Sequence, residues 1–187
     1  MKRNEKIQKL VKACKKREFK AQRMLYDTYV DTMYYVVKRY VNDEYYIANI
    51  VQDIFLKIFN NIDKYDSIKG AFSTWINTIA VRETINHLKK QKNFMVYNQN
   101  LKVVKSTEEG ILDKLNADDI LEVLSSIHEK YRTVFNLYEI DGFSHKEIAE
   151  ILGITDSSSR TYLTRAKKIL QERINQMNNQ KFTTYGR

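Results

Sequence analysis

The absence of proline is the feature of this 187-residue sequence that most constrains its fold. Glycine occurs only five times, whereas residues that favour helices, such as Leu, Lys, Glu and Gln, are common. Strands joined by tight turns depend on glycine and proline at the turns, and this chain offers few of either. The sequence therefore predicts an all-helical protein, long enough for one medium domain or two small ones.

Apolar residues recur at helical spacing over most of the chain. In residues 5–42 the pattern predicts two helices with a break near Lys16, and a third helix should cover residues 43–61. A polar loop at residues 63–70 separates it from a fourth helix, which begins at Phe72 and ends in a lysine-rich stretch. These elements would form one small domain.

The periodicity fades after residue 93, where Asn, Gln, Ser and Lys are mixed with scattered apolar residues. We therefore expect two small helical domains joined by a flexible linker, the C-terminal one a helix-turn-helix. The predicted divisions are a first domain at residues 1–93, a linker at 94–115, a second domain at 116–178 and a tail at 179–187.

Charge is segregated along the chain, whose net charge is +9. Basic blocks at residues 1–40, 82–105 and 157–187 carry +8, +5 and +6, and acidic blocks at 41–81 and 106–156 carry −2 and −8. Solubility alone would allow the two signs to be evenly mixed. Separate blocks favour two surfaces for a polyanion and others for protein, with solvated helix faces as the alternative interpretation.

Residues 144–166, SHKEIAEILGITDSSSRTYLTRA, have the pattern of two short helices joined by a tight turn. Ser144 and Glu147 have capping-box spacing, which defines the start of the first helix. Ala149 and Gly153 are small enough to let the second helix cross closely, and this helix should begin near Asp156. The pattern predicts a helix-turn-helix whose second helix enters the major groove of DNA.

The second helix of this pair carries a polar, cationic stripe beside its apolar one. A helix in the major groove needs such side chains to contact base edges and phosphates. Ser159 faces back toward the first helix, where a branched apolar residue is usual, so its hydroxyl needs a backbone carbonyl as partner. The residues predicted to bind DNA are Ser158, Arg160, Thr161, Thr164 and Arg165, with Lys167 and Lys168 on flanking phosphates.

Three segments resemble one family of bacterial proteins. YRTVFNLYEIDGFSHKEIAEILGITDSSSRTYLTRAKKIL is similar to the C-terminal DNA-binding domain of extracytoplasmic-function (ECF) sigma factors, the two-domain initiation subunits of RNA polymerase. YIANIVQDIFLKIFNNIDKYD resembles their polymerase-clamp helix, and AFSTWINTIAVRETINHLKKQK resembles the helix that opens and reads the minus-10 element. The resemblance covers about residues 19–176 and implies a sigma factor that binds core polymerase, recognises minus-35 and minus-10 elements and melts the promoter.

On the third helix, polar side chains lie beside a heavily apolar face that exposes more apolar surface than one small domain needs. Such a face suits docking against another protein's coiled coil, although a simple core with a solvated edge is an equally good explanation without the resemblance. The residues predicted to bind core polymerase are Asn49, Gln52, Asp53, Phe55, Leu56 and Phe59.

The resemblance also implies the residues that handle the melted minus-10 element. The loop at 65–71 would hold a flipped base of the non-template strand, with Ser67 and Lys69 as polar contributors. The next helix would contact the upstream end and backbone through Arg82, Asn86, Lys89 and Lys90. The family commonly has Asn at position 82 and Asp at position 86, and both differ here, so the family's minus-10 preference is not carried over to this chain. Trp75 is interpreted as a packing residue.

Enzymatic chemistry is not indicated. Cys14 is the only cysteine, so neither a disulfide nor a CxxC metal site can form within one chain. His87, His128 and His145 lack the HxxxH and HExxH spacings of metal sites and are interpreted as surface or interface histidines. We predict no metal, no cofactor and no catalytic residue.

The sequence also bears on location and partners. It contains no apolar run of membrane-spanning length, and no signal-peptide pattern follows its basic N-terminus, so we expect a cytoplasmic protein without stable membrane insertion. The resemblance implies that its partners are promoter DNA, the clamp coiled coil and flap of core RNA polymerase, and an anti-sigma factor.

Two other functions remain open from the sequence. A helix-turn-helix regulator with an N-terminal sensing or dimerisation domain would bind DNA by itself, at half-sites about one helical turn apart. A DNA-processing enzyme would show metal-dependent turnover. A sigma factor would instead bind core polymerase tightly and duplex DNA poorly when alone.

Overall fold

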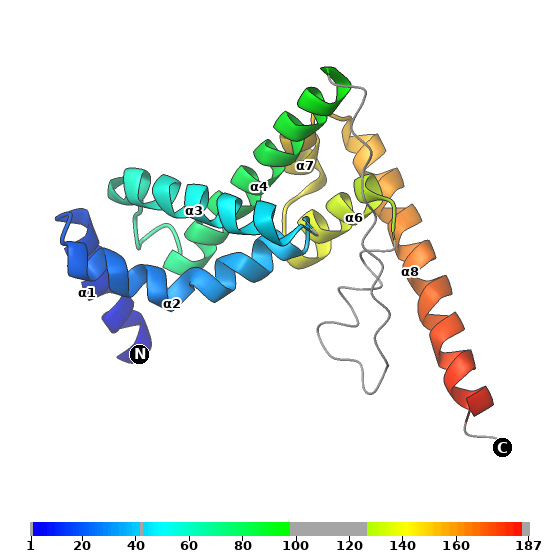
Figure 1. The fold of residues 1–187 in the computed structure, drawn as a ribbon, viewed down its shortest axis with the longest axis horizontal. Coiled ribbons are helices and arrows are strands. Elements are labelled where there is room, and N and C mark those ends of the chain that lie inside the picture. Colours follow the sequence, from blue (N-terminus) through cyan, green and yellow to red (C-terminus); the bar gives the residue numbers. More distant parts are fainter. Residues whose placement is uncertain (1, 42, 98–126, 185–187) are drawn as a thin grey trace. The chain divides into compact units, whose positions relative to one another are not determined.

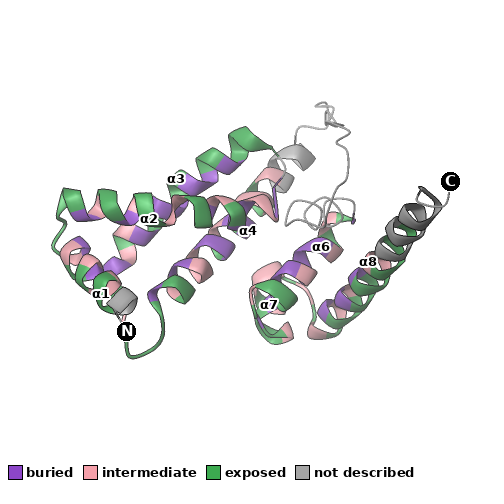
Figure 2. Cartoon of the chain, turned by 90° about the horizontal axis from the view of Figure 1, so that it is seen from below, coloured by how far each residue is buried: buried purple, intermediate pink, exposed green. Residues whose placement is uncertain are grey.

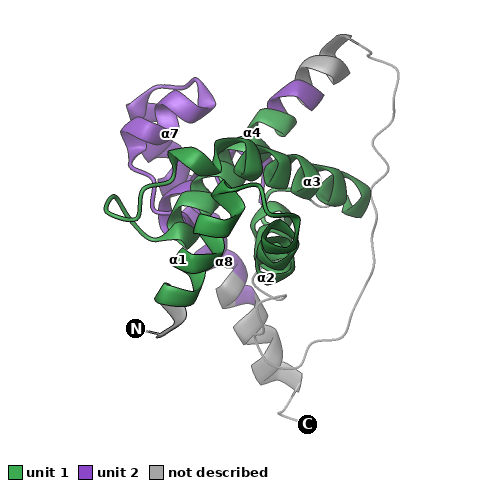
Figure 3. Cartoon of the chain, turned by 90° about the vertical axis from the view of Figure 1, so that its left-hand side faces the viewer, with its two compact units in different colours: residues 1–88 green, residues 89–187 purple. Residues whose placement is uncertain are grey.

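The computed structural model describes residues 2–41, 43–97 and 127–184, and every regular element in these residues is a helix (Figure 1). The prediction of an all-helical fold is confirmed for this part of the chain. Two compact units are distinguished, residues 1–88 and 89–187 (Figure 3). The elements are α1 (Lys2–Lys15), α2 (Phe19–Lys38), α3 (Glu44–Asn61), the 3-10 helix η1 (Ile62–Lys64), α4 (Phe72–Tyr97), α6 (Glu129–Phe135), the π-helix η2 (Asn136–Ile140), α7 (His145–Leu152) and α8 (Asp156–Thr184).

The break between α1 and α2 falls where the sequence predicts it. Arg17 has a φ of 61°, in the left-handed region, which ends α1 and lets the chain turn. Its guanidinium donates hydrogen bonds to the Phe59 carbonyl at 2.7 Å and to the Asp63 carboxylate at 3.0 Å. The turn is therefore tied to the region where α3 ends.

The apolar faces of α1, α2, α3 and α4 form the core of the first unit, which appears as the buried stripes of Figure 2. The start of α3 is fixed by Asp43, whose side chain accepts hydrogen bonds from the backbone amides of Tyr45 and Tyr46. Each fully buried aliphatic side chain contributes about 1.5–3 kcal/mol to stability. The side chains with no more than 1% exposure include Leu25, Met33, Val37, Ile47, Ile54, Ile58 and Ile76.

Helix α4 continues to Tyr97, four residues into the segment predicted as a linker. The sequence pattern weakens before the helix ends because its last turns lack a regular apolar stripe. The rest of the predicted linker, and the start of the helix expected from residue 116, lie outside the described residues.

The second unit is built from α6, η2, α7 and α8. The Ser144 hydroxyl and the Glu147 carboxylate form both halves of a capping box at the start of α7, as predicted. Leu137 and Ile148 are completely buried. Around them lie the other buried apolar side chains of this unit: Ile127, Val134, Phe143, Leu163 and Ala166.

Candidate nucleic-acid interface

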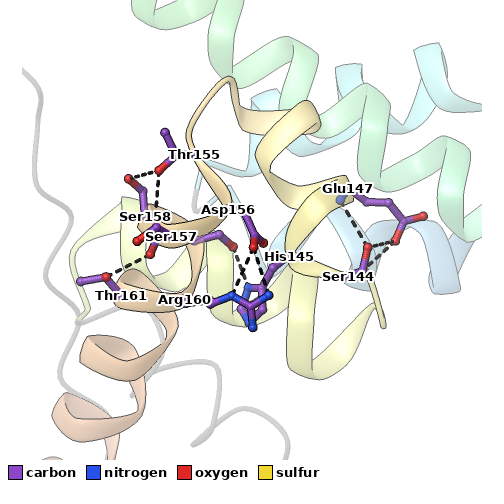
Figure 4. A network of polar contacts seen from close by, with 10 residues as sticks. Ser144, His145, Glu147, Thr155, Asp156, Ser157, Ser158, Arg160 and Thr161 are labelled. Carbon is purple, nitrogen blue, oxygen red and sulfur yellow. Dashed lines mark hydrogen bonds and ion pairs between the residues drawn. The ribbon is translucent and has the colours of Figure 1, made fainter.

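Helix α8 begins where the sequence predicts the recognition helix. The Thr155 hydroxyl accepts a hydrogen bond from the Ser158 backbone amide at 3.0 Å and donates one to the Ser158 hydroxyl at 2.8 Å (Figure 4). The first of these bonds satisfies an amide of the first turn that would otherwise lack a partner. The first turn of α8, with Ser158 in it, therefore has a fixed conformation.

Gly153 ends α7 for a different reason from the one expected. A Cβ atom at this position would meet nothing within 4 Å, so close crossing of the second helix does not require glycine. The backbone instead adopts a φ of 71°, a left-handed conformation that glycine accepts without steric cost. The predicted turn is present, but its glycine is needed for backbone conformation.

Ser159 is fully buried, as its direction toward α7 requires. Its hydroxyl lies 2.9 Å from Nδ1 of His145, so the partner is a side chain and not the expected backbone carbonyl. The His145 ring stacks on Tyr138, with centroids 4.3 Å apart and an interplanar angle of 20°. His145 thus fixes α8 against α7 and η2, a structural role that the sequence did not reveal.

Three of the predicted DNA-binding cations have partners within the second unit. Arg160 donates two hydrogen bonds to Oδ2 of Asp156, at 3.0 and 3.2 Å. Lys167 forms an ion pair with Glu139 of η2 at 2.7 Å. These partners hold long side chains in defined positions at the surface of α8.

The third cation, Arg165, donates a hydrogen bond to the Tyr131 hydroxyl at 3.1 Å. This bond favours the phenolate, and together with Lys130 it lowers the pKa of Tyr131 from its usual value. The remaining predicted residues Thr161, Thr164 and Lys168 are exposed on the same helix. Both threonine hydroxyls donate to carbonyls one turn earlier and keep oxygen lone pairs free for a ligand.

An aromatic and cationic cluster lies beside Arg165, and sequence reasoning missed it. Lys130 of α6 lies 4.9 Å from the ring centroid of Tyr131 and 5.3 Å from that of Tyr162 on α8. The two rings meet edge to face, 5.5 Å apart. Basic and aromatic residues alternate in EKYR, but only the packing of α6 on α8 brings them to Arg165.

In the first unit, the loop expected to hold a flipped base is fixed at both ends. The buried Tyr65 hydroxyl donates to the Gly70 carbonyl at 3.0 Å and accepts from the Gln8 amide at 3.1 Å. Lys15 donates to the Tyr65 carbonyl at 2.8 Å. Between these anchors the side chain of Ile68 is 93% exposed. Gln8 and Lys15 had no predicted role, because their contacts with the loop join residues distant in sequence.

The polar residues expected at the minus-10 element are all at the surface. Ser67 and Lys69 of the loop are exposed. The ring centroid of Trp75 lies 5.6 Å from that of the buried Tyr65, which supports a packing role for Trp75. The residues of α4 that are exposed are Arg82, Asn86, Lys89 and Lys90.

One residue of the predicted polymerase-binding face, Phe55, does not offer the exposed apolar surface that the sequence suggests. Phe55 is only 3% exposed, and its ring centroid lies 4.5 Å from that of Tyr26. It therefore belongs to the core and offers no apolar surface. Leu56 is 61% exposed, and Phe59 is half-buried. The helical wheel explains the error, because Phe55 lies one turn from the buried Val51 and Ile58 on the inward side of α3.

The polar residues of this face, Asn49, Gln52 and Asp53, are exposed. Asp53 also lies against His87 of α4, whose Nε2 is 3.0 Å from Oδ2. Lys57 and Glu83 form an ion pair across the same helices at 3.5 Å. The predicted docking face is therefore braced by the helix that carries Arg82 and Asn86.

The described residues contain no group of three or more side chains that could hold a metal ion. In the same residues, no helix combines the length and the apolar character needed to cross a membrane.

Comparison with known proteins identifies the class to which these two units belong. The family of sigma-70 region 2 matches residues 25–94, and the family of sigma-70 region 4 matches residues 117–170. The region 2 match covers the N-terminal unit, which the alternative of a helix-turn-helix regulator would need for sensing or dimerisation. The match therefore favours the sigma factor over that alternative. Both units are thus those of a sigma-70 transcription initiation factor.

Similar proteins narrow this class. The ECF RNA polymerase sigma factor SigW of Bacillus subtilis is 28% identical over 181 residues, which cover 90% of this chain and 96% of that protein. The ECF RNA polymerase sigma-E factor of Escherichia coli K12 is 26% identical, covering 89% and 93% of the two chains. A solved structure, the sigma factor RpoE with the anti-sigma factor NepR from Bartonella quintana, has a TM-score of 0.58 at 17% identity and covers 82% of this chain and 96% of that one.

The chain belongs to the ECF RNA polymerase sigma factor family. It directs promoter-specific transcription initiation with RNA polymerase, and this family consists of initiation factors and not enzymes.

Proposed function

We propose that the two units divide promoter recognition between them. The second unit reads the minus-35 element with α8, and the first unit docks on the polymerase clamp through α3 and melts the minus-10 element with its loop and α4. The proposed modules are those predicted from the sequence, residues 1–93 and 116–178, joined by residues 94–115. The observation that carries this proposal is the capped recognition helix, with its polar and cationic side chains exposed opposite a buried stripe.

For the minus-35 element, the geometry of α8 supports duplex recognition. Arg160 and Arg165 are each held by a neighbouring side chain, so less rotamer entropy is lost when they bind a base edge or a phosphate. Thr161 and Thr164 lie between them with free acceptors. Lys167 and Lys168 would neutralise flanking phosphates, and Ser158 lies at the end of α8 that enters the groove.

For the minus-10 element, the first unit combines a fixed loop with an exposed cationic helix. Melting requires a place for an extruded base and cations for single-stranded phosphates. Ser67 and Lys69 project from the loop, while Arg82, Asn86, Lys89 and Lys90 lie along α4.

For core polymerase, we propose a docking face on α3 formed by Asn49, Gln52, Asp53, Leu56 and Phe59 against the clamp coiled coil. Phe55 supports this face from within the core. We also propose that the second unit contacts the flap, that the protein acts in the cytoplasm, and that an anti-sigma factor holds it inactive. The Bartonella quintana sigma factor with a similar fold was solved in complex with an anti-sigma factor, which supports the last point.

Transcription reconstituted with purified core polymerase on genomic fragments tests the whole proposal. We expect association with core and at least one specific start site. Failure of both would contradict the proposal, whereas duplex binding at paired half-sites without polymerase would indicate a helix-turn-helix regulator.

Substitution of the two arginines tests the minus-35 assignment. Arg160→Ala or Arg165→Ala should cost about 1–3 kcal/mol of discrimination at one base pair if the side chain reads a base, and should weaken binding uniformly if it holds a phosphate. A panel of promoters with single minus-35 changes separates these outcomes. No effect of either substitution on any promoter would contradict the assignment.

A further inference from the structure

One edge of α8 differs electrostatically from the other. With 100° of rotation per residue, Ser159, Leu163 and Ala166 point into the core, and Arg160 and Lys167 lie on the opposite edge from Tyr162 and Arg165. The cations of the Arg160 edge are both paired with carboxylates, those of Asp156 and Glu139.

On the other edge, Arg165 of α8 and Lys130 of the neighbouring helix α6 contact tyrosine side chains instead of carboxylates. We call the group of Lys130, Tyr131, Tyr162 and Arg165 the α6 rim. Lys130 lies over both rings, and Arg165 donates to the Tyr131 hydroxyl at 3.1 Å. A ring holds a cation by its face while leaving the full positive charge uncompensated. Burial lowers the pKa of Arg132, and the nearby Glu129 carboxylate offsets part of this lowering.

The cations of the α6 rim are accessible to a ligand that approaches from solvent. Lys130 and Arg165 are exposed, and the half-buried rings of Tyr131 and Tyr162 support their stems. The two cations come from different helices yet converge on one phenol, that of Tyr131. A helix in the major groove lies between two phosphate backbones, so this uncompensated edge faces one of them.

We propose that Lys130 and Arg165 together bind a backbone phosphate of duplex DNA beside the minus-35 element. Tyr131 and Tyr162 position the two cations, and α6 becomes part of the DNA interface. The inference rests on the proposed entry of α8 into the groove. The contact is independent of sequence, because only phosphate oxygens are bound.

The test uses the full chain assembled with core polymerase and promoter fragments that carry the minus-35 element as duplex. Binding is measured across a series of KCl concentrations for Lys130→Ala and for Lys12→Ala, a control that removes one exposed positive charge from α1. Lys130→Ala should weaken binding equally for all minus-35 sequences and reduce the slope of log K against log salt by about 0.9. Tyr131→Phe, which keeps the ring and removes the hydroxyl, should give a smaller loss of affinity.

Identical salt curves for Lys130→Ala and Lys12→Ala would overturn the inference, and so would a loss confined to particular minus-35 sequences. Lys168→Ala distinguishes this failure from failure of the proposed function. If Lys168→Ala weakens binding and Lys130→Ala does not, only the α6 rim is wrong. If neither variant differs from the Lys12→Ala control, the assignment of α8 to the minus-35 element is wrong as well.

Discussion

The two exposed cationic surfaces of this sigma factor differ in how their side chains are held. On α8, Arg160, Arg165 and Lys167 each have a partner between 2.7 and 3.1 Å away. On α4, no hydrogen bond or ion pair of the Arg82, Lys89 or Lys90 side chain occurs within the described residues. Duplex DNA presents a regular array of groups, whereas a melted strand does not. Side chains held by partners suit the first target, and side chains without such partners in the described part of the chain suit the second.

The two units also differ in the contacts that hold the backbone of each surface in place. In the first unit, Gln8 and Lys15 fix the loop backbone around Tyr65, and Arg17 fixes the preceding turn. In the second unit, the helix-turn-helix is held by a small apolar core and by the contact of His145 with Ser159. In the first unit, long-range hydrogen bonds from α1 and from the following turn fix the backbone of the loop and of the helix end before it, whereas the second unit places partners on the cationic side chains of α8 themselves.

The largest expected effect comes from removing the core on which the ordered side chains of α8 depend. Ile148→Ala truncates a fully buried side chain and should destabilise the second unit by about 2–5 kcal/mol. Denaturant unfolding followed separately in each unit should show the loss in the second alone. Minus-35 binding should fall with it.

Ile140→Ala is the matched control, because Ile140 belongs to the same unit and is 42% exposed. It should change stability by much less than Ile148→Ala does. Equal losses in both units after Ile148→Ala would contradict the contrast, since the two units would then share one cooperative core.

The local parts of this architecture could be predicted from the sequence. The break near Lys16, the start of α3, the capping box at Ser144 and the start of α8 at Asp156 all depend on residues a few positions apart. Such signals lie within a few consecutive residues, so they can be recognised without knowing how the helices pack.

The remaining features depend on contacts between elements. The α6 rim needs Lys130 and Tyr162, which lie on different helices. The support of the loop by α1 joins Gln8 to Tyr65, 57 positions later in the chain. No periodicity within one segment reveals such pairs.

A smaller effect is expected when the ordered backbone of the first unit is loosened. Tyr65→Phe leaves the Gly70 carbonyl and the Gln8 amide without their common partner and should cost about 1 kcal/mol of stability. Promoter opening, followed by permanganate reactivity of unpaired thymines, should become less efficient, while minus-35 duplex binding stays unchanged. Tyr35→Phe is the control, because that ring is 56% exposed. Normal opening by a destabilised Tyr65→Phe protein would show that the loop does not need this backbone order.

The smallest expected effect distinguishes two roles of Glu139, which holds the Lys167 side chain in place and also neutralises its charge. Glu139→Gln removes the carboxylate that holds Lys167, and exposed ion pairs of this kind contribute only about 0–1 kcal/mol. Stability should therefore barely change. Non-specific duplex binding should rise severalfold, because one cation is released and one repulsion from phosphate is lost.

Asp31→Asn is a control that neutralises an exposed acid of α2 in the other unit. If Glu139→Gln raises affinity for all duplexes and Asp31→Asn does not, the carboxylate partners of α8 limit sequence-independent binding as well as ordering the cations. If instead Glu139→Gln lowers affinity, the fixed position of Lys167 contributes more than its released charge. The contrast with the cations of α4, which have no partner within the described residues, would then rest on geometry alone.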